Sequence, residues 1–237
     1  MTLKKTKQTK IIVRIFCVTL HPISKKTADL EYSTTYRQQL KKRIVSTAMM
    51  EFTAKGVRAV KMDDIAKKLS ISKRTIYELY GNKEQLLYEG VKEHQKIREK
   101  QFDKLLSQKL SVMDIILRLY ENAINDLKDV TPTFFSDITK YPSVVQLIDS
   151  AKQKRRQRTL ELLRQGTEEG SFIKDVNFDL ILNLSNSMSD IVMQQKLYEK
   201  YTMQDIIQSI VFASLRGICT LQGIKMLDEA KKQTHTE

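Results

Sequence analysis

Hydroxyl and cationic side chains stand together near residue 72, at the start of a short predicted helix. Ser72, Lys73, Arg74 and Thr75 are consecutive there, and serine is a favoured residue for capping a helix N-terminus. Arginine and lysine suit guanine edges or phosphates, and hydroxyl groups suit either. A helix laid in the major groove of DNA uses its N-terminal residues on base edges. These residue types therefore predict a surface that reads DNA.

A second short helix is expected directly before this one. Between Met62 and Leu69, the apolar residues Ile65, Ala66 and Leu69 recur one helical turn apart, which predicts an amphipathic helix. Ser70 and the residues after it break that spacing and predict a tight turn. The pattern is typical of two helices that cross at a short connection.

The later of these two helices, from Ser72 to Tyr80, is expected to bury one face and expose the other. Ile76, Leu79 and Tyr80 fall on the inward face. Tyr77 and Glu78 fall on the outer surface with the cationic residues. Gly81 follows, and we expect it to stop the helix in the left-handed backbone conformation. Asn82 then caps a third, longer helix.

Across this stretch the sequence resembles the tetracycline-repressor (TetR) family of bacterial transcriptional regulators. The resemblance runs without a gap from Arg43 to Leu87. It departs from the family pattern at Lys61 (usually a capping threonine), Ser70 (usually a turn glycine) and Leu79 (often histidine or tyrosine). The matching residues are Ile44, Ala48, Phe52, Gly56, Asp64, Ile65, Ala66, Ile71, Ser72, Thr75, Ile76, Tyr77, Tyr80, Lys83, Glu84, Leu86 and Leu87.

The resemblance implies an all-α fold with a three-helix helix-turn-helix DNA-binding domain at the N-terminus. A helical ligand-binding and dimerisation domain would follow it. The first helix should run from near Tyr36 to Lys55 and end at Gly56. We predict three parts: a basic extension over 1–36, the DNA-binding domain over 37–83, and the effector-binding and dimerisation domain over 84–237.

Seven residues are predicted to contact DNA. Lys73, Arg74 and Thr75 are assigned to bases, while the others position or grip the phosphate backbone, which is how most protein contacts with DNA are made. The set is Lys61, Ser72, Lys73, Arg74, Thr75, Tyr77 and Lys83.

The charge distribution favours the same conclusion. The chain has 237 residues and a net charge of +13. The first 83 residues hold 19 Lys and Arg against six acidic residues, whereas the remainder holds 22 of each sign. A basic N-terminal third followed by a neutral region is typical of a DNA-binding domain joined to a domain with another task.

Residues 1–36 are predicted to be a disordered basic arm. Their lysines precede an apolar run, Ile11 to Leu20, which superficially resembles a signal peptide, but Arg14 interrupts it and no clean cleavage site follows. Two alternatives stay open: a start codon assigned too far upstream, and a tail that attracts anionic membrane surfaces.

Helical spacing continues through the rest of the chain, and the resemblance implies that these helices enclose an effector pocket. Expected helices include 111–128, one beginning at Pro132 and one beginning at Pro142. The basic run 152–158 lies inside the last of these and is interpreted as a solvated helix face. Methionine and aromatic side chains suit an adaptable cavity for a small apolar or amphipathic effector. The candidates are Met113, Tyr120, Phe134, Phe135, Tyr141 and Met188.

The last two predicted helices, 177–201 and 203–231, carry apolar stripes. The resemblance implies that they form a four-helix interface with their mates in a homodimer. Ala213, Gly217 and Gly223 would allow a close approach of helices. The alternative is burial of these stripes against the chain's own helices. A two-fold dimer suits an inverted-repeat operator, because it presents two recognition helices.

Enzymatic activity is not expected. The histidines are isolated, no phosphate-binding glycine loop or nucleophile motif occurs, and Cys17 and Cys219 are far apart, so neither a metal, a cofactor nor a disulfide is predicted. We interpret the chain as a cytoplasmic homodimeric repressor, without membrane contact, that a small molecule releases from its operator. The alternative is an architectural DNA-binding protein without effector control.

Overall fold

The computed structural model of this chain describes residues 36–127 and 129–234, and within those ranges the protein is built from α-helices. One isolated β-bridge, between Phe172 and Cys219, is the single strand-like pairing there. The predicted basic extension lies outside the described residues, apart from Tyr36. The helices are α2 (Tyr36–Lys55), α3 (Met62–Lys68), α4 (Lys73–Leu79), α5 (Lys83–Leu106), α6 (Val112–Leu127), α7 (Pro132–Ile138), α8 (Pro142–Glu168), α9 (Phe178–Gln194), a 3-10 turn (Leu197–Glu199), α10 (Met203–Ile218) and α11 (Leu221–Thr234).

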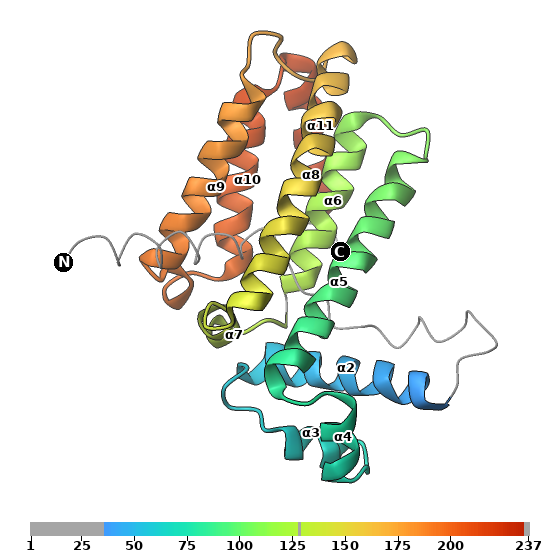
Figure 1. The fold of residues 1–237 in the computed structure, drawn as a ribbon. Helices are drawn as coiled ribbons and strands as arrows, with labels where there is room; N and C mark the ends of the chain where they lie inside the picture. The colour runs from blue at the N-terminus through green and yellow to red at the C-terminus, as the bar shows by residue number, and fades with distance from the viewer. Residues whose placement is uncertain (1–35, 128, 235–237) are drawn as a thin grey trace.

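The first three of these helices form a small N-terminal unit at one end of the molecule (Figure 1). The predicted first helix is confirmed at Tyr36–Lys55, and Gly56 ends it with a φ of +85°. The caps are also as predicted: Ser72 Oγ accepts a hydrogen bond from Thr75 N, and Asn82 Oδ1 accepts one from Gln85 N.

The left-handed residue of the helix-turn-helix is Ser70, not Gly81. Ser70 has a φ of +55°, whereas Gly81 is not among the residues with positive φ; α4 ends at Leu79, and the C-cap residue Tyr80 has a φ of −143°. Our prediction for Gly81 was therefore wrong. The strained position is in the turn between α3 and α4, where four residues join the two helices and where a glycine would be unstrained.

The long helices form a bundle above this unit. Helix α5 leaves the N-terminal unit and runs the length of the bundle beside α6 and α8, while the short α7 lies across the junction (Figure 1). Helices α5 and α8 run in the same direction, because Glu84 pairs with Ser143 near one end and Asp103 pairs with Arg158 near the other. Helices α9 and α10 form one side of the bundle.

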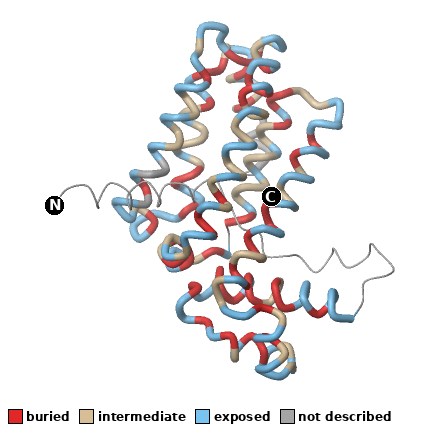
Figure 2. Tube along the Cα trace, viewed as in Figure 1, coloured by how far each residue is buried: buried red, intermediate tan, exposed pale blue. Residues whose placement is uncertain are grey.

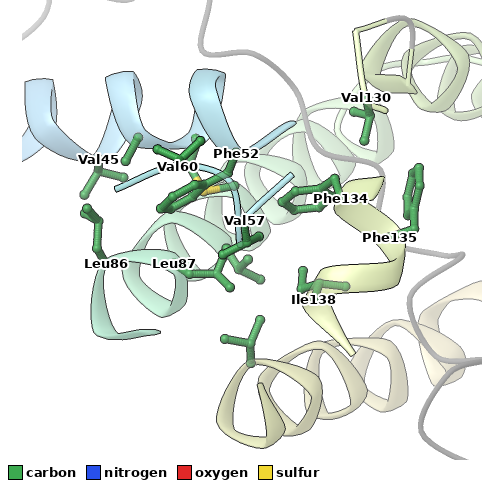
Figure 3. Close-up of a cluster of buried hydrophobic side chains, with 14 of the residues drawn as sticks. Val45, Phe52, Val57, Val60, Leu86, Leu87, Val130, Phe134, Phe135 and Ile138 are labelled. Carbon is green, nitrogen blue, oxygen red and sulfur yellow. The ribbon is translucent and has the colours of Figure 1, made fainter. Parts of the chain in front are cut away.

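One continuous set of buried side chains, here called the proximal cluster, joins the N-terminal unit to the bundle. Figure 3 shows Phe52 of α2, Leu87 of α5 and Phe134 of α7 in the same cluster. All three side chains are essentially inaccessible to solvent. Buried positions, drawn red in Figure 2, occur both in the N-terminal unit and in the bundle above it. The domain boundary predicted at residue 83 therefore lies between two segments of the chain whose buried side chains share one hydrophobic core.

A second set, the distal cluster, fills the far end of the bundle. It includes Phe102, Val112, Leu160 and Phe172. Two buried clusters are expected when a bundle is longer than one layer of side chains.

The predicted helix 203–231 is in fact two helices. Helix α10 ends at Ile218, and α11 begins at Leu221. The break occurs where Cys219 pairs with Phe172, and Thr220 Oγ1 then accepts a hydrogen bond from Gly223 N to cap α11. The expected helix 177–201 likewise ends early, at Gln194.

The strain at Ser70 leads to a stability prediction. Replacing Ser70 with glycine should raise the free energy of unfolding by about 0.5–1 kcal/mol, because glycine adopts a positive φ without steric cost. Thermal and urea unfolding would measure this change. Ser107→Gly is the matched control, because Ser107 is an exposed helix-end serine with a φ of −77°. A Ser70→Gly protein no more stable than Ser107→Gly would contradict the assignment of strain.

Candidate nucleic-acid interface

Helix α4 presents the predicted reading residues on the outside of the N-terminal unit. Ile76 is fully buried and Tyr80 nearly so, which orients the helix. Ser72, Lys73 and Arg74 are exposed at its N-terminus, and Thr75 is half-buried with its hydroxyl 2.8 Å from that of Ser72. A short helix with an anchored inner face and an exposed N-terminus has the geometry needed to enter a groove.

The two cations of α4 are held by neighbouring carboxylates. Lys73 forms an ion pair with Asp63 of α3, which raises the pKa of the Lys73 ammonium through their hydrogen bond. Arg74 Nε donates to Glu78 Oε1 over 2.6 Å, and both side chains are exposed. Exposed ion pairs of this kind contribute roughly 0–1 kcal/mol. Either cation can therefore exchange its carboxylate for a base edge or a phosphate at low cost.

Tyr77 and Lys61 lie on the same outer surface. The Tyr77 side chain is 47% exposed, so its ring and hydroxyl are accessible to a partner. Lys61 is exposed at the N-terminus of α3, and its backbone N–H donates to Asp64 Oδ2 over 3.1 Å. The Asp64 carboxylate thus binds the amide of the N-cap residue, as in one half of a capping box, while the Asp64 amide donates to the Lys61 carbonyl over 3.1 Å.

Lys83 occupies a different environment from the other predicted contacts. Its Nζ donates to the carbonyl oxygens of Val60 (2.9 Å) and Arg58 (3.2 Å), and burial lowers the pKa of its ammonium. Lys83 therefore fastens the loop between α2 and α3 to the start of α5. One of its three N–H groups is left over for a phosphate contact.

Two further side chains hold the unit together behind this surface. The Tyr80 hydroxyl donates to the Lys41 carbonyl over 3.1 Å, and burial raises the pKa of Tyr80 to about 12. Glu51 is buried between Lys55 and Lys68, and their hydrogen bonds lower the pKa of its carboxyl. Lys55 and Lys68 are thus partly engaged within the protein.

The loop before α3 is also fastened to α7, which the sequence analysis did not foresee. The Asp137 carboxylate, nearly inaccessible to solvent, accepts a hydrogen bond from Arg58 N over 2.8 Å and lies 3.3 Å from Lys140 Nζ. Thr131 donates twice to the carbonyl of Thr53, over 2.9 Å from its amide and 3.0 Å from its hydroxyl. These bonds join residues about 80 positions apart, so no local pattern announces them.

Four of the six predicted pocket residues belong to or pack against the proximal cluster, namely Tyr120, Phe134, Phe135 and Tyr141. Phe134 and Phe135 are adjacent on α7, with ring centroids 6.0 Å apart, and Tyr141 packs against the same proximal cluster. Tyr120 stacks edge-on against Phe212 at 4.8 Å. Met113 belongs instead to the distal cluster, and Met188 is 39% exposed on α9.

A surface groove is present elsewhere on the bundle. It has a volume of about 440 Å³ and lies between the end of α8 and the start of α9. Leu160 and Phe178 form its apolar floor, and Arg164, Lys174 and Asp179 are among its charged lining. None of the six predicted pocket residues lines it.

The basic run in α8 is largely used within the protein. Arg156 pairs with Asp179 over 2.6 Å, Arg158 pairs with Asp103, and Arg155 donates to Gln95 Oε1 over 2.8 Å. This run therefore ties α8 to α5 and α9. Its arginines are more engaged than the predicted solvated face would require.

Residues 36–127 and 129–234 contain neither a candidate membrane span nor a candidate metal site. No helix there is both long and apolar enough to cross a membrane. No three His, Cys, Asp or Glu side chains gather there in a way that could bind a metal ion. Cys219 is buried as a free thiol, and burial raises its pKa to about 11.

Comparison with known proteins identifies the N-terminal unit. Residues 44–89 match the sequence model of the family described as "Bacterial regulatory proteins, tetR family". This range covers most of α2, all of α3 and α4, and the start of α5. A comparison with curated proteins found no match.

Solved structures resemble the whole helical arrangement. A TetR family transcriptional regulator from Agrobacterium tumefaciens is 14% identical, with a TM-score of 0.62 over 78% of this chain and 100% of that one. A protein from Saccharomonospora viridis, solved in complex with choline, is 21% identical, with a TM-score of 0.63 over 77% and 99%. A gamma-butyrolactone receptor is 11% identical, with a TM-score of 0.61 over 84% and 100%. At these identities the likeness concerns the fold, and the family match rests on the N-terminal unit: residues 44–89 form a domain of the kind found in the tetR family of bacterial regulatory proteins.

Proposed function

We propose that this regulator is a homodimeric repressor, acting in the cytoplasm, that binds an inverted-repeat operator and leaves it when a small effector binds. The observation that carries the proposal is the exposed, cationic N-terminus of α4 on a helix whose opposite face is anchored in a core. In this account Lys73, Arg74 and Thr75 contact bases. Ser72, Lys61, Tyr77 and Lys83 contact the backbone.

Selection of bound duplexes from a random DNA pool tests this proposal directly. With the purified protein at near-physiological salt, we expect an inverted repeat with half-sites about one helical turn apart or more. No enriched motif, together with binding that collapses as salt rises, would favour an architectural protein that contacts only phosphates.

An unpartnered apolar face on α9 supports the dimer. Leu180, Leu184, Met188 and Ile191 are between 39% and 53% exposed, and their spacing places them along one side of the helix. On the adjacent α10, a side chain added at Gly217 would meet nothing within 4 Å. Exposed apolar patches on this scale mark interaction surfaces, and a second copy would cover this one.

The two glycines of the predicted interface, Gly217 and Gly223, lie in different surroundings. Gly217 is exposed and open, as a close helix contact requires. Gly223 is buried, because the Ser171 carbonyl of the same chain occupies the space a side chain would need. The proposed interface therefore uses α9 and α10, while α11 packs within the subunit.

Helix α7 supplies a route by which an effector in the bundle would act on DNA binding. It packs on α2 and its Asp137 fastens the loop that leads into α3. A shift of α7 would therefore change the position of the reading helices. Small ligands are accommodated in this fold, since one solved relative holds choline and another is named as a gamma-butyrolactone receptor. Coupling between two such sites is typically 1–3 kcal/mol.

Arg74 and Lys61 should have different effects on DNA binding. Arg74→Ala should relax specificity at one base position, at a cost of roughly 1–3 kcal/mol. Lys61→Ala should weaken all duplexes alike and reduce the salt slope by about one unit. Binding titrations with the selected operator and its single-base variants, over a range of salt, would separate the two. Arg74 would lose its base-reading role if its removal weakened every duplex equally.

The dimer face can be tested with one added charge. Leu184→Glu should convert the dimer to monomer, because two buried carboxylates would face each other across the two-fold axis. Sedimentation or light scattering would measure the mass. Leu221→Glu is the matched control, because Leu221 is 87% exposed on α11 and lies off this face. Equal masses for both variants would show that α9 is not the interface.

Removing the Asp137 carboxylate should loosen the loop at Arg58 that it binds. Asp137→Ala removes the acceptor of the part-buried Arg58 N–H, so we expect a loss of about 0.5–1.5 kcal/mol in unfolding free energy. Faster amide hydrogen exchange at Arg58 and weaker operator binding should accompany it. Asp175→Ala, at an exposed acidic residue, is the control. Unchanged exchange at Arg58 would mean that α7 does not hold this loop.

A further inference from the structure

A layer of polar side chains interrupts the apolar interior of the bundle between the proximal and distal clusters. On α5, Val91 belongs to the proximal cluster and Phe102 to the distal one. Between them His94 and Gln95 are buried. Asp126 of α6 and Arg155 of α8 complete the layer from the two neighbouring helices.

The charges in this layer are paired across helices. Arg98 Nη1 lies 2.5 Å from Asp126 Oδ2, and His94 Nε2 lies 3.9 Å from the same oxygen. Burying such groups is costly, and apolar residues of similar size would fill the same space with equal or greater stability. A polar layer at this depth therefore needs a reason other than packing.

The hydrogen bonding of the Gln95 side chain indicates why this layer is polar. Its side chain is only 9% exposed, and its Oε1 accepts a hydrogen bond from Arg155 Nη2 over 2.8 Å. A guanidinium can only donate, so this bond fixes the orientation of the amide and turns Nε2 away from Arg155. Nε2 is itself buried, and no acceptor among residues 36–127 and 129–234 is bonded to it.

An amide N–H₂ group without an acceptor, next to a guanidinium, is a pair of donors aimed at an oxygen atom. Buried polar groups almost always have partners, and one without a partner calls for an explanation. In ligand pockets, a few such groups placed in an apolar interior fix the orientation of the ligand. The apolar clusters above and below the layer would surround the rest of the molecule.

We infer that Gln95 and Arg155 bind the carboxylate or carbonyl oxygen of an otherwise apolar effector, within the bundle between α5, α6 and α8. This inference rests on the proposed function, which assigns the bundle to an effector. It names the polar end of the site and the chemical class of the ligand. It also places the site apart from the surface groove at the end of α8.

Gln95→Glu is the sharpest variant, because it keeps the acceptor for Arg155 and replaces the N–H₂ donor by a second acceptor. Gln95→Met removes both functions and provides a second arm if a buried glutamate prevents folding. Gln153→Glu makes the same chemical change at an exposed position of α8 and is the control. Acetate, benzoate and octanoate, each with its methyl ester, are the probes, and acetate reports on the polar layer alone.

Thermal unfolding midpoints and calorimetric titration of the DNA-free protein would measure binding. We expect at least one acid to raise the midpoint of the wild-type protein and of Gln153→Glu, with at least tenfold weaker binding in both Gln95 variants. Binding of acids alone would assign the oxygen to a carboxylate beside Arg155, and binding of esters as well would assign it to a carbonyl. No binding of any probe by the wild type, or equal binding by the Gln95 variants, would overturn the inference.

Operator binding by the same ligand-free preparations separates this result from the proposed function. We expect all folded variants to bind the selected inverted repeat as the wild type does. A wild-type protein that binds acids but selects no DNA sequence would contradict the proposed function and leave the ligand site standing.

Discussion

The proximal cluster is the interaction on which the rest of the structure depends. It places Phe52 of α2, Leu87 of α5 and Phe134 of α7 in one buried set, so the DNA-binding unit has no separate core of its own. Each such side chain contributes roughly 1.5–3 kcal/mol when buried. Because packed interiors resist small displacements, any movement of α7 or α5 must be shared by α2. The fold thereby links the bundle to the reading helices without a flexible joint.

Polar contacts also connect the loop between α2 and α3 to α5 and α7. Asp137 and Lys83 fasten opposite sides of the short loop between α2 and α3, one to α7 and the other to α5. The two cations of α4 are held by ion pairs at the surface, such as Arg74 with Glu78. The loop is therefore rigid where it meets the bundle, and the side chains are free to exchange partners where they meet DNA. That division suits the proposed function, in which the protein reads a DNA sequence and responds to a ligand.

Much of the N-terminal unit could be predicted from the sequence because its signals are local. The inward spacing of Ile65, Ile76 and Tyr80, and the caps at Ser72 and Asn82, depend on residues within one or two turns. What could not be predicted depends on distant contacts. The break between α10 and α11 follows from the pairing of Phe172 with Cys219, and Asp137 meets Arg58 across 79 positions. The polar layer left a faint signal, since His94 and Gln95 interrupt an otherwise apolar stripe on α5.

In the proposed function, two copies of α4 read DNA together from one rigid dimer. A hydroxyl-radical footprint of the full-length protein on its selected operator would show this arrangement. We expect two protected patches on one face of the duplex, separated by about 34–36 Å or a further helical turn, with the strongest protection at the inverted repeats. A single patch, or uniform protection with no preferred face, would contradict it.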